Sequence, residues 1–322
     1  MNTRIVATCL LALSISCLSA EEAAPKKDKH TIGFAAKSFQ DPFTSWQAQT
    51  VKKFAKESYP NFDLKLLDSE MSVEKQTNLV ENFISQKVDL IIVQPLDAQA
   101  LIPAIDKAYA LRPPIPVINL ALKIDDKHSV SLESDPVLEG RLIGDYAAKH
   151  LPKGAKVAIL QGEPGNLAAA SRQKGILEGL KARPDIKVIA DQTSNWRRDK
   201  AMAITEDWLQ AYPQIDAILC HNDDSALGAI EALKAKGKAG KVMVLGVDGL
   251  PEALKAIEEG LMTGTVVQQV VDQARTTLEV ADKLLKGEKV NRHIQIPGEL
   301  VSKENKNVQK WIDIEKEAGL IK

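Results

Sequence analysis

The stretch VDLIIVQPLDAQAL, residues 88–101, contains the pattern that decides the fold class of this chain. Its apolar run, Leu90 to Val93, predicts a short strand that is buried on both faces, as in a parallel sheet covered by helices. A polar tip at Gln94 follows, and Asp97 then predicts the N-cap of a helix. The stretch is therefore one strand–turn–helix unit.

The same order recurs in IDAILCHNDDSAL, residues 215–227, although this stretch is one residue shorter. The echo favours two similar α/β lobes. Other apolar runs alternate with helical patterns, at residues 31–36, 64–67, 117–120, 157–160, 188–190, 242–247 and 265–267. Apolar strands between amphipathic helices predict βαβ units, so the expected fold class is α/β with parallel sheets in two three-layer lobes.

Size and charge agree with that class. A chain of 322 residues is too long for one small core and suits two domains. The net charge is −1, without a basic stripe, which argues against a nucleic-acid partner.

The N-terminus predicts export. Residues 1–20 have the pattern of a signal peptide, with Arg4 before a mostly apolar run and small residues at Ser19 and Ala20. Residues 21–30 read as a polar tether, and the expected location is the periplasm. A lipoprotein acylated at Cys17 is the alternative, although the residues before it make a poor lipobox.

The candidate site is a set of side chains at the predicted strand tips. In an open parallel sheet, ligands bind beyond the carboxyl ends of the strands. The candidates are Asp41, Phe43, Gln94, Asn119, Asn166, Trp196, Asn222, Asp248 and Gln268. Amides and carboxylates match hydroxyl groups in pairs, and aromatic rings stack on the C–H faces of a sugar or cyclitol. Phe43 and Trp196 would be the two jaws of such a clamp.

The same tips carry no nucleophile–base pair, no Cys/His cluster at metal spacing and no phosphate loop. The chain is therefore not expected to be an enzyme, and neither a cofactor nor a metal is predicted. Cys220 and His221 are adjacent on a predicted strand, so their side chains point to opposite faces and cannot easily share a proton.

Short motifs in a fixed order resemble periplasmic sugar-binding proteins of the ribose, galactose and inositol type, the solute receptors of ABC importers. The resemblance runs from about Thr31 to about Asn307 and is closest to the inositol-binding branch. It rests on DPF (41–43), VQP (93–95), GRLIGDYAAKHL (140–151), ILQGEPGN (159–166), QTSNWRRDKAM (192–202), NDDSALGAI (222–230), GVDGLPEAL (246–254) and ADKLLKGEKV (281–290).

The resemblance implies two Rossmann-like lobes joined by a three-segment hinge, with the ligand in the cleft between them. The first lobe would hold residues 31–132 and 266–294, and the second residues 133–265 and 295–322. The hinge crossings would fall near residues 131–134, 263–268 and 294–297. Closure of the lobes would deliver the ligand to an ABC permease, and the protein would be a monomer.

The resemblance also distributes the ligand contacts. It gives Asp41, Phe43 and Gln94 to the first lobe, Trp196, Asn222 and Asp248 to the second, and Gln268 to the hinge. Arg172 matches a ligand-binding arginine of the galactose-type pattern, whereas the ribose and inositol patterns place that arginine at Ala170.

Two adjacent positions depart from the family. Where its members commonly carry a charged pair after the fourth strand, this chain has Ala121 and Leu122. Such a pocket has fewer hydroxyl partners, so a smaller or less polar polyol, a deoxy sugar or a methylated cyclitol is expected.

Several residues have simpler interpretations. Trp46, Trp208 and Trp311 are expected to pack in the core or between helices. Asp97 and Asp135 are expected to cap helices, as is Asp223 or Asp224, which would leave Asn222 for the cleft. Arg197 and Arg198 read as a solvated helix start.

One other function stays as an alternative, and two further classes are argued against. A receptor for chemotaxis or for a sensor kinase would use the same closure. A transcription repressor would begin with a DNA-binding helix-turn-helix instead of a signal peptide, and an exported α/β enzyme would need a reactive set at the strand tips.

Overall fold

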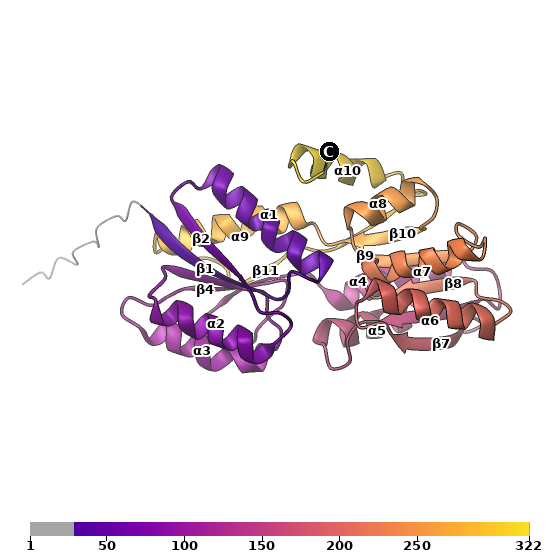
Figure 1. The fold of residues 1–322 in the computed structure, drawn as a ribbon, viewed down its shortest axis with the longest axis horizontal. Coiled ribbons are helices and arrows are strands. Elements are labelled where there is room, and N and C mark those ends of the chain that lie inside the picture. The colour runs from indigo at the N-terminus through magenta and orange to yellow at the C-terminus, as the bar shows by residue number, and fades with distance from the viewer. Residues whose placement is uncertain (1–28, 322) are drawn as a thin grey trace, which may run out of the picture.

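The computed structural model describes residues 29–321, so the predicted signal peptide, Cys17 and most of the tether lie outside the described residues. Figure 1 shows two α/β lobes lying side by side along the long axis. Among the residues described, the first lobe contains β1 (His30–Ala36), α1 (Pro42–Ser58), β2 (Phe62–Asp68), α2 (Val73–Ser85), β3 (Leu90–Val93), α3 (Ala98–Ala110), β4 (Val117–Leu120) and β5 (Val130–Glu133).

The chain then forms the second lobe and afterwards returns to the first sheet with β11. The second lobe contains α4 (Pro136–His150), β6 (Lys156–Gln161), α5 (Leu167–Leu180), β7 (Lys187–Thr193), α6 (Arg198–Ala211), β8 (Ala217–Cys220), α7 (Asp223–Ala235), β9 (Met243–Asp248), α8 (Pro251–Glu258) and β10 (Gly264–Val267). After it come α9 (Val270–Leu285), β11 (His293–Gln295), β12 (Glu299–Ser302) and α10 (Val308–Glu317).

Each lobe is built on a six-stranded sheet. The strand orders are β11-β5-β4-β3-β1-β2 and β12-β10-β9-β8-β6-β7. All neighbouring strands are parallel except β10 and β12. The predicted α/β class with two parallel-sheet lobes is confirmed, and β3 and β8 are fully buried, as their apolar runs indicate.

The chain passes between the two sheets three times, after β5, after β10 and after β11. These passages lie at or next to the predicted crossings. Val266 and Val267 were expected in the first lobe. They are instead the last two residues of the buried strand β10, and they pair with β9 in the second sheet. Gln295, expected in the second lobe, pairs with β5 in the first sheet.

Glycines let α4 and α5 pack with their backbones in contact. A Cβ atom on Gly175 would overlap the carbonyl oxygen of Val137 and lie 2.6 Å from the Arg141 nitrogen. A Cβ atom on Gly140 would overlap the carbonyl oxygen of Arg172. Since both helices begin at the cleft between the lobes, this close packing fixes two of its edges.

The C-terminal helix α10 contacts both lobes (Figure 1). Trp311 and Ile312 pack in the core of the second lobe, whereas Ala318 and Leu320 pack against the core of the first. On α1, Trp46 of the first lobe packs against the second-lobe core. The predicted packing roles of Trp46, Trp208 and Trp311 are confirmed.

Glu315 on α10 predicts a pH dependence of stability. Its side chain is 2% exposed and its Oε2 has no hydrogen-bond partner. Burial, together with the charge of Asp223, raises its pKa from 4.5 to about 8. Between these values the folded state keeps a proton that the unfolded state releases, so the free energy of unfolding falls as the pH rises.

We expect Glu315→Gln to remove much of this loss and to be more stable than the parent protein at pH 8 by about 3 kcal/mol. The two proteins should differ little near pH 4.5, which denaturant titrations across the pH range would measure. Glu317→Gln, an exposed position on the same helix, is the control. Equal pH slopes for the parent and Glu315→Gln would contradict the assignment.

Candidate ligand-binding site

A cavity of about 330 Å³ lies between the lobes, at the carboxyl ends of strands from both sheets. The parallel topology explains its position, because all these strand ends face the junction. The predicted site residues that line it are Asp41, Phe43, Gln94, Asn166, Arg172, Trp196, Asn222, Asp248 and Gln268. Tertiary structure thus brings together side chains that the sequence spreads over more than two hundred residues.

Asn119 does not line the cavity, and this prediction is wrong. The residue lies inside β4 instead of beyond its end, and it is fully buried. Its amide donates to the Oγ atoms of Ser129 and Ser131, at 2.6 and 3.2 Å. Because the cavity lies beyond the carboxyl ends of the strands, a residue before the end of β4 is buried in the sheet and does not reach it.

The two predicted aromatic jaws both line the cavity and are both only 9% exposed. Phe43 also packs with the second-lobe core. Trp196 has a left-handed backbone (φ 64°), and its ring packs against Gly162, where no Cβ atom would fit. Trp196 is therefore a buried packing residue as well as a candidate jaw of the clamp.

Lys37, which the sequence analysis did not select, belongs to the same corner of the cavity. Its Nζ lies 5.9 Å from the centroid of the Trp196 ring, across the junction of the lobes. The Arg172 guanidinium lies 5.7 Å from the same ring. Lys37 immediately follows β1, and this position beyond a strand end was the signal that could have found it.

Arg172 is held by an ion pair inside the second lobe. Its Nε donates to Glu139 Oε2 at 2.9 Å, and its Nη1 donates to the His221 carbonyl oxygen at 2.7 Å. The two side chains are 7% and 0% exposed. Arg172 thus lies at the cavity with two of its nitrogens bound to the protein, and Nη2 makes no hydrogen bond within residues 29–321.

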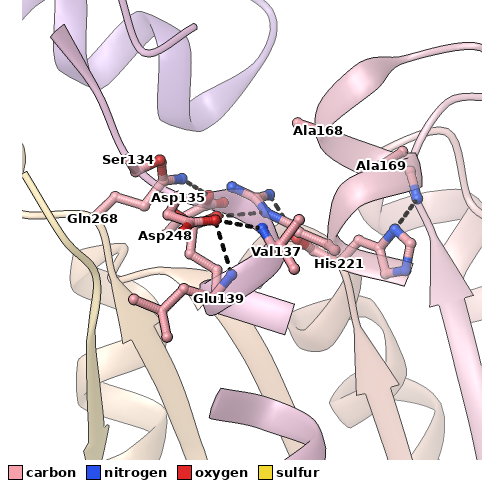
Figure 2. A network of polar contacts seen from close by, with 12 residues as sticks. Ser134, Asp135, Val137, Glu139, Ala168, Ala169, His221, Asp248 and Gln268 are labelled. Carbon is pink, nitrogen blue, oxygen red and sulfur yellow. Dashed lines mark hydrogen bonds and ion pairs between the residues drawn. The ribbon is translucent and has the colours of Figure 1, made fainter. Parts of the chain in front are cut away.

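Asp248 and Gln268 form a polar link to the first hinge crossing, as Figure 2 shows. Gln268 Nε2 donates to Asp248 Oδ1 at 2.8 Å, and Ser134 Oγ donates to Gln268 Oε1 at 3.2 Å. Asp248 is 3% exposed, and burial raises its pKa well above the ordinary value. Arg172 counters this rise, while the charges of Asp223 and Asp41 add to it.

The predicted helix cap at Asp223 or Asp224 is wrong, because Asn222 caps α7 and accepts from the Ser225 nitrogen at 3.2 Å. Asn222 still lines the cavity. Asp223 instead accepts from the nitrogens of Gly249 and Leu250, at 2.8 and 2.9 Å. It therefore holds the loop beside Asp248, and burial raises its pKa to about 7.

Other cavity residues also have structural partners. Asp41 caps α1, where its Oδ1 accepts from the Thr44 nitrogen at 2.8 Å, and Asn166 caps α5. Gln94 donates to Thr44 O and Gln47 Oε1 and accepts from the Lys37 nitrogen. Both Gln94 donors are thus used inside the first lobe, so it supports the cavity wall and has little left to offer a ligand.

Cys220 and His221 agree with the prediction of no catalytic role. Burial raises the pKa of the Cys220 thiol well above its usual range. His221 lies between Gly162 N at 3.1 Å and Gln173 Oε1 at 3.0 Å, and burial beside Arg172 lowers its pKa to about 3. Within residues 29–321 there is no group of three or more His, Cys, Asp or Glu side chains that could hold a metal ion.

The two arginines predicted to be solvated differ in their surroundings. Arg197 is exposed and pairs with Asp199, as expected. Arg198 instead joins an ion-pair network with Asp224 and Glu252 on neighbouring helices, so that part of the prediction is wrong. The predicted helix caps at Asp97 and Asp135 are confirmed. No helix between residues 29 and 321 is long and apolar enough to cross a membrane.

Two α/β lobes with a polar and aromatic cavity at their junction define a binding protein that holds its ligand between the lobes. A family model described as a periplasmic binding protein domain matches residues 32–289. The chain belongs to this family. Its members bind solutes and are not enzymes, in agreement with the prediction from the strand tips.

Relatives and solved structures cover almost the whole chain. The ribose import binding protein RbsB of Salmonella typhimurium is 34% identical over 305 residues, which cover 94% of this chain and 100% of the relative. The xylitol-binding protein of Mycolicibacterium smegmatis is 32% identical, with 94% and 86% covered. An ABC transporter solute binding protein from Bacillus halodurans C-125, solved with bound myo-inositol, has a TM-score of 0.82 at 32% identity, with 89% and 98% covered.

Proposed function

We propose that the protein is the solute receptor of an ABC importer and that it captures a sugar, polyol or cyclitol in the interlobe cavity. The observation that carries the proposal is the cavity itself, about 330 Å³ in volume and lined by polar and aromatic side chains from both lobes. A ligand that contacts both lobes stabilises the closed form only through contacts that the open form lacks.

The chemistry of the lining supports a ligand rich in hydroxyl groups. Asp41 and Arg172 supply a charged acceptor and charged donors, which form the stronger class of hydrogen bond to hydroxyls, and Asp248 adds a carboxyl group. Phe43 and Trp196 supply flat apolar surface for C–H groups. The relatives named for ribose and xylitol, and the structure with myo-inositol, support the same ligand class.

Three further parts of the proposal follow from the family and the sequence. The protein is exported to the periplasm by the signal peptide at residues 1–20, acts as a monomer and delivers its ligand to a permease in the inner membrane. A receptor for chemotaxis or for a sensor kinase remains the alternative, because closure would serve that role equally.

A thermal-shift screen of the chain from Glu21 tests the ligand class. A ligand that binds only the folded state raises the unfolding midpoint with ln(1 + [L]/Kd). We expect a hit among sugars, polyols, cyclitols and their derivatives. If every compound left the midpoint unchanged up to millimolar concentration, the proposal of a carbohydrate ligand would fail.

Asp248→Asn is expected to weaken binding of the strongest compound from this screen by about 10- to 100-fold, because a carboxyl oxygen that can accept from a ligand hydroxyl is replaced by an amide nitrogen that only donates. The fold should keep its stability, since burial already disfavours the charged form of Asp248. Isothermal titration calorimetry would measure the change. Asp207→Asn, an exposed change on α6, is the control, and unchanged affinity in Asp248→Asn would remove Asp248 from the site.

A further inference from the structure

Part of the cavity lining has apolar side chains, which offer a ligand no hydrogen bonds. These residues come from the tips of β3 and β4 and from the start of α5. We name this surface the leucine wall, and it consists of Leu96, Ala121, Leu122, Leu167 and Ala168. The charged and amide side chains Asp41, Asp248, Arg172 and Asn222 line the rest of the same cavity.

The backbone of the leucine wall is also largely occupied. The Leu96 nitrogen donates to Gln76 Oε1 at 2.8 Å, and the Ala121 nitrogen donates to the Leu132 carbonyl oxygen at 2.8 Å. The Ala168 nitrogen donates to Asn166 Oδ1 at 3.0 Å. Three of the five wall residues therefore have neither a polar side chain nor a free backbone donor for a ligand.

Two polar side chains, Asp97 and Gln99, also line the cavity, and both are exposed. The Asp97 Oδ1 atom caps α3 and accepts from the nitrogens of Gln99 and Ala100. Leu167, by contrast, keeps 57% of its surface exposed, which is unusual for a leucine at a helix start and leaves apolar area for a partner.

A hydroxyl group placed against such a surface loses its bound water and gains no partner. A methyl group or a bare C–H edge at the same place gains apolar contact instead. We propose that the physiological ligand is a sugar, polyol or cyclitol that carries an apolar substituent, such as a deoxy methyl or an O-methyl group, and directs it at the leucine wall. This inference rests on the proposed function and narrows its ligand class.

Matched pairs of compounds test the leucine wall separately from the rest of the cavity. The members of each pair share their stereochemistry and differ at one hydroxyl. Suitable pairs are D-galactose and D-fucose, L-mannose and L-rhamnose, D-ribose and 5-deoxy-D-ribose, D-chiro-inositol and D-pinitol, and myo-inositol and sequoyitol. Isothermal titration calorimetry with the chain from Glu21 gives the affinity ratio within each pair.

We expect at least one pair in which the deoxy or methylated member binds about tenfold or more tightly than its parent. If the fully hydroxylated parent were preferred in every pair that binds, the inference would be overturned while the proposed function stood. If no member of any pair bound while another compound of the thermal-shift screen did, the inference would also be overturned, whereas the proposed function would fail only if no compound of the screen bound. The two failures are therefore distinguishable.

Leu122→Arg tests whether the wall causes the preference, because it adds hydrogen-bond donors to a half-buried position at the cavity. We expect the preference for the apolar member to be lost or reversed, with the unfolding midpoint of the free protein unchanged. Leu177→Arg is the matched control, since Leu177 is 41% exposed on α5 and does not line the cavity. An unchanged affinity ratio in Leu122→Arg would also overturn the inference.

Discussion

Glu139→Ala is expected to destabilise the protein by about 3–5 kcal/mol, the largest effect of any single polar change considered. Glu139 is fully buried, and its Oε2 accepts from Arg172 Nε at 2.9 Å. Removing the carboxylate leaves the Arg172 guanidinium buried without its counter-ion. The loss is therefore mostly the free energy of desolvating an unpaired charge, which exceeds the net contribution of the pair itself.

The same substitution should also weaken ligand binding, because Glu139 positions Arg172 at the cavity. Glu139 does not line the cavity, so it acts through Arg172 and not by direct contact. Denaturant unfolding measures the first effect, and calorimetry below the unfolding transition measures the second.

A double variant separates the charge from the packing. Glu139→Leu combined with Arg172→Met replaces the ion pair by apolar groups of similar size and should recover much of the lost stability. Binding should stay weak, since the guanidinium is absent. If Glu139→Ala alone unfolded at the same denaturant concentration as the parent, the pair would not hold this part of the second lobe together.

Gly175→Ala is expected to destabilise the protein by about 3 kcal/mol, although alanine is the better helix former. The added Cβ atom would overlap the Val137 carbonyl oxygen on α4 and lie 2.6 Å from the Arg141 nitrogen. Both are backbone atoms, so no side chain can rotate away. The helices α4 and α5 would have to separate, and both begin at the cavity.

Chemical denaturation would measure this loss of stability. The sign of the change distinguishes a steric clash between the helices from an effect of helix propensity. Helix propensity alone predicts a gain of about 1 kcal/mol for glycine to alanine inside a helix. Lys174→Ala, at an exposed neighbouring position on α5, is the control and should change stability by less than about 0.5 kcal/mol. A gain in Gly175→Ala would show that the two helices do not pack as closely as described.

The fold class could be predicted because its signals are local. The apolar run from Leu90 to Val93 forms a fully buried strand, and Asp97 caps the following helix as expected. Alternation of such units along the chain predicts parallel sheets, and both sheets have this form. Parallel topology also places strand ends at one edge, so most of the candidate residues lie at the cavity.

The errors arose where a shift of one residue changes the role of a side chain. Asn119 is the third residue of β4 and is fully buried, whereas Leu120, the next residue and the last of the strand, lines the cavity. At α7 the cap is Asn222, which frees Asp223 to hold the loop at Gly249 and Leu250. Periodicity alone does not fix boundaries at this precision.

By itself, the sequence determined the class, the order of the strands and helices and the chemical character of the site, because apolar periodicity and side-chain chemistry are properties of short segments. Only the tertiary structure decided which polar groups remain available. The Gln94 amide makes hydrogen bonds to Thr44, Gln47 and Lys37, and Arg172 donates to Glu139. These partners come from distant segments, and each hydrogen bond within the protein removes a donor or acceptor from the ligand.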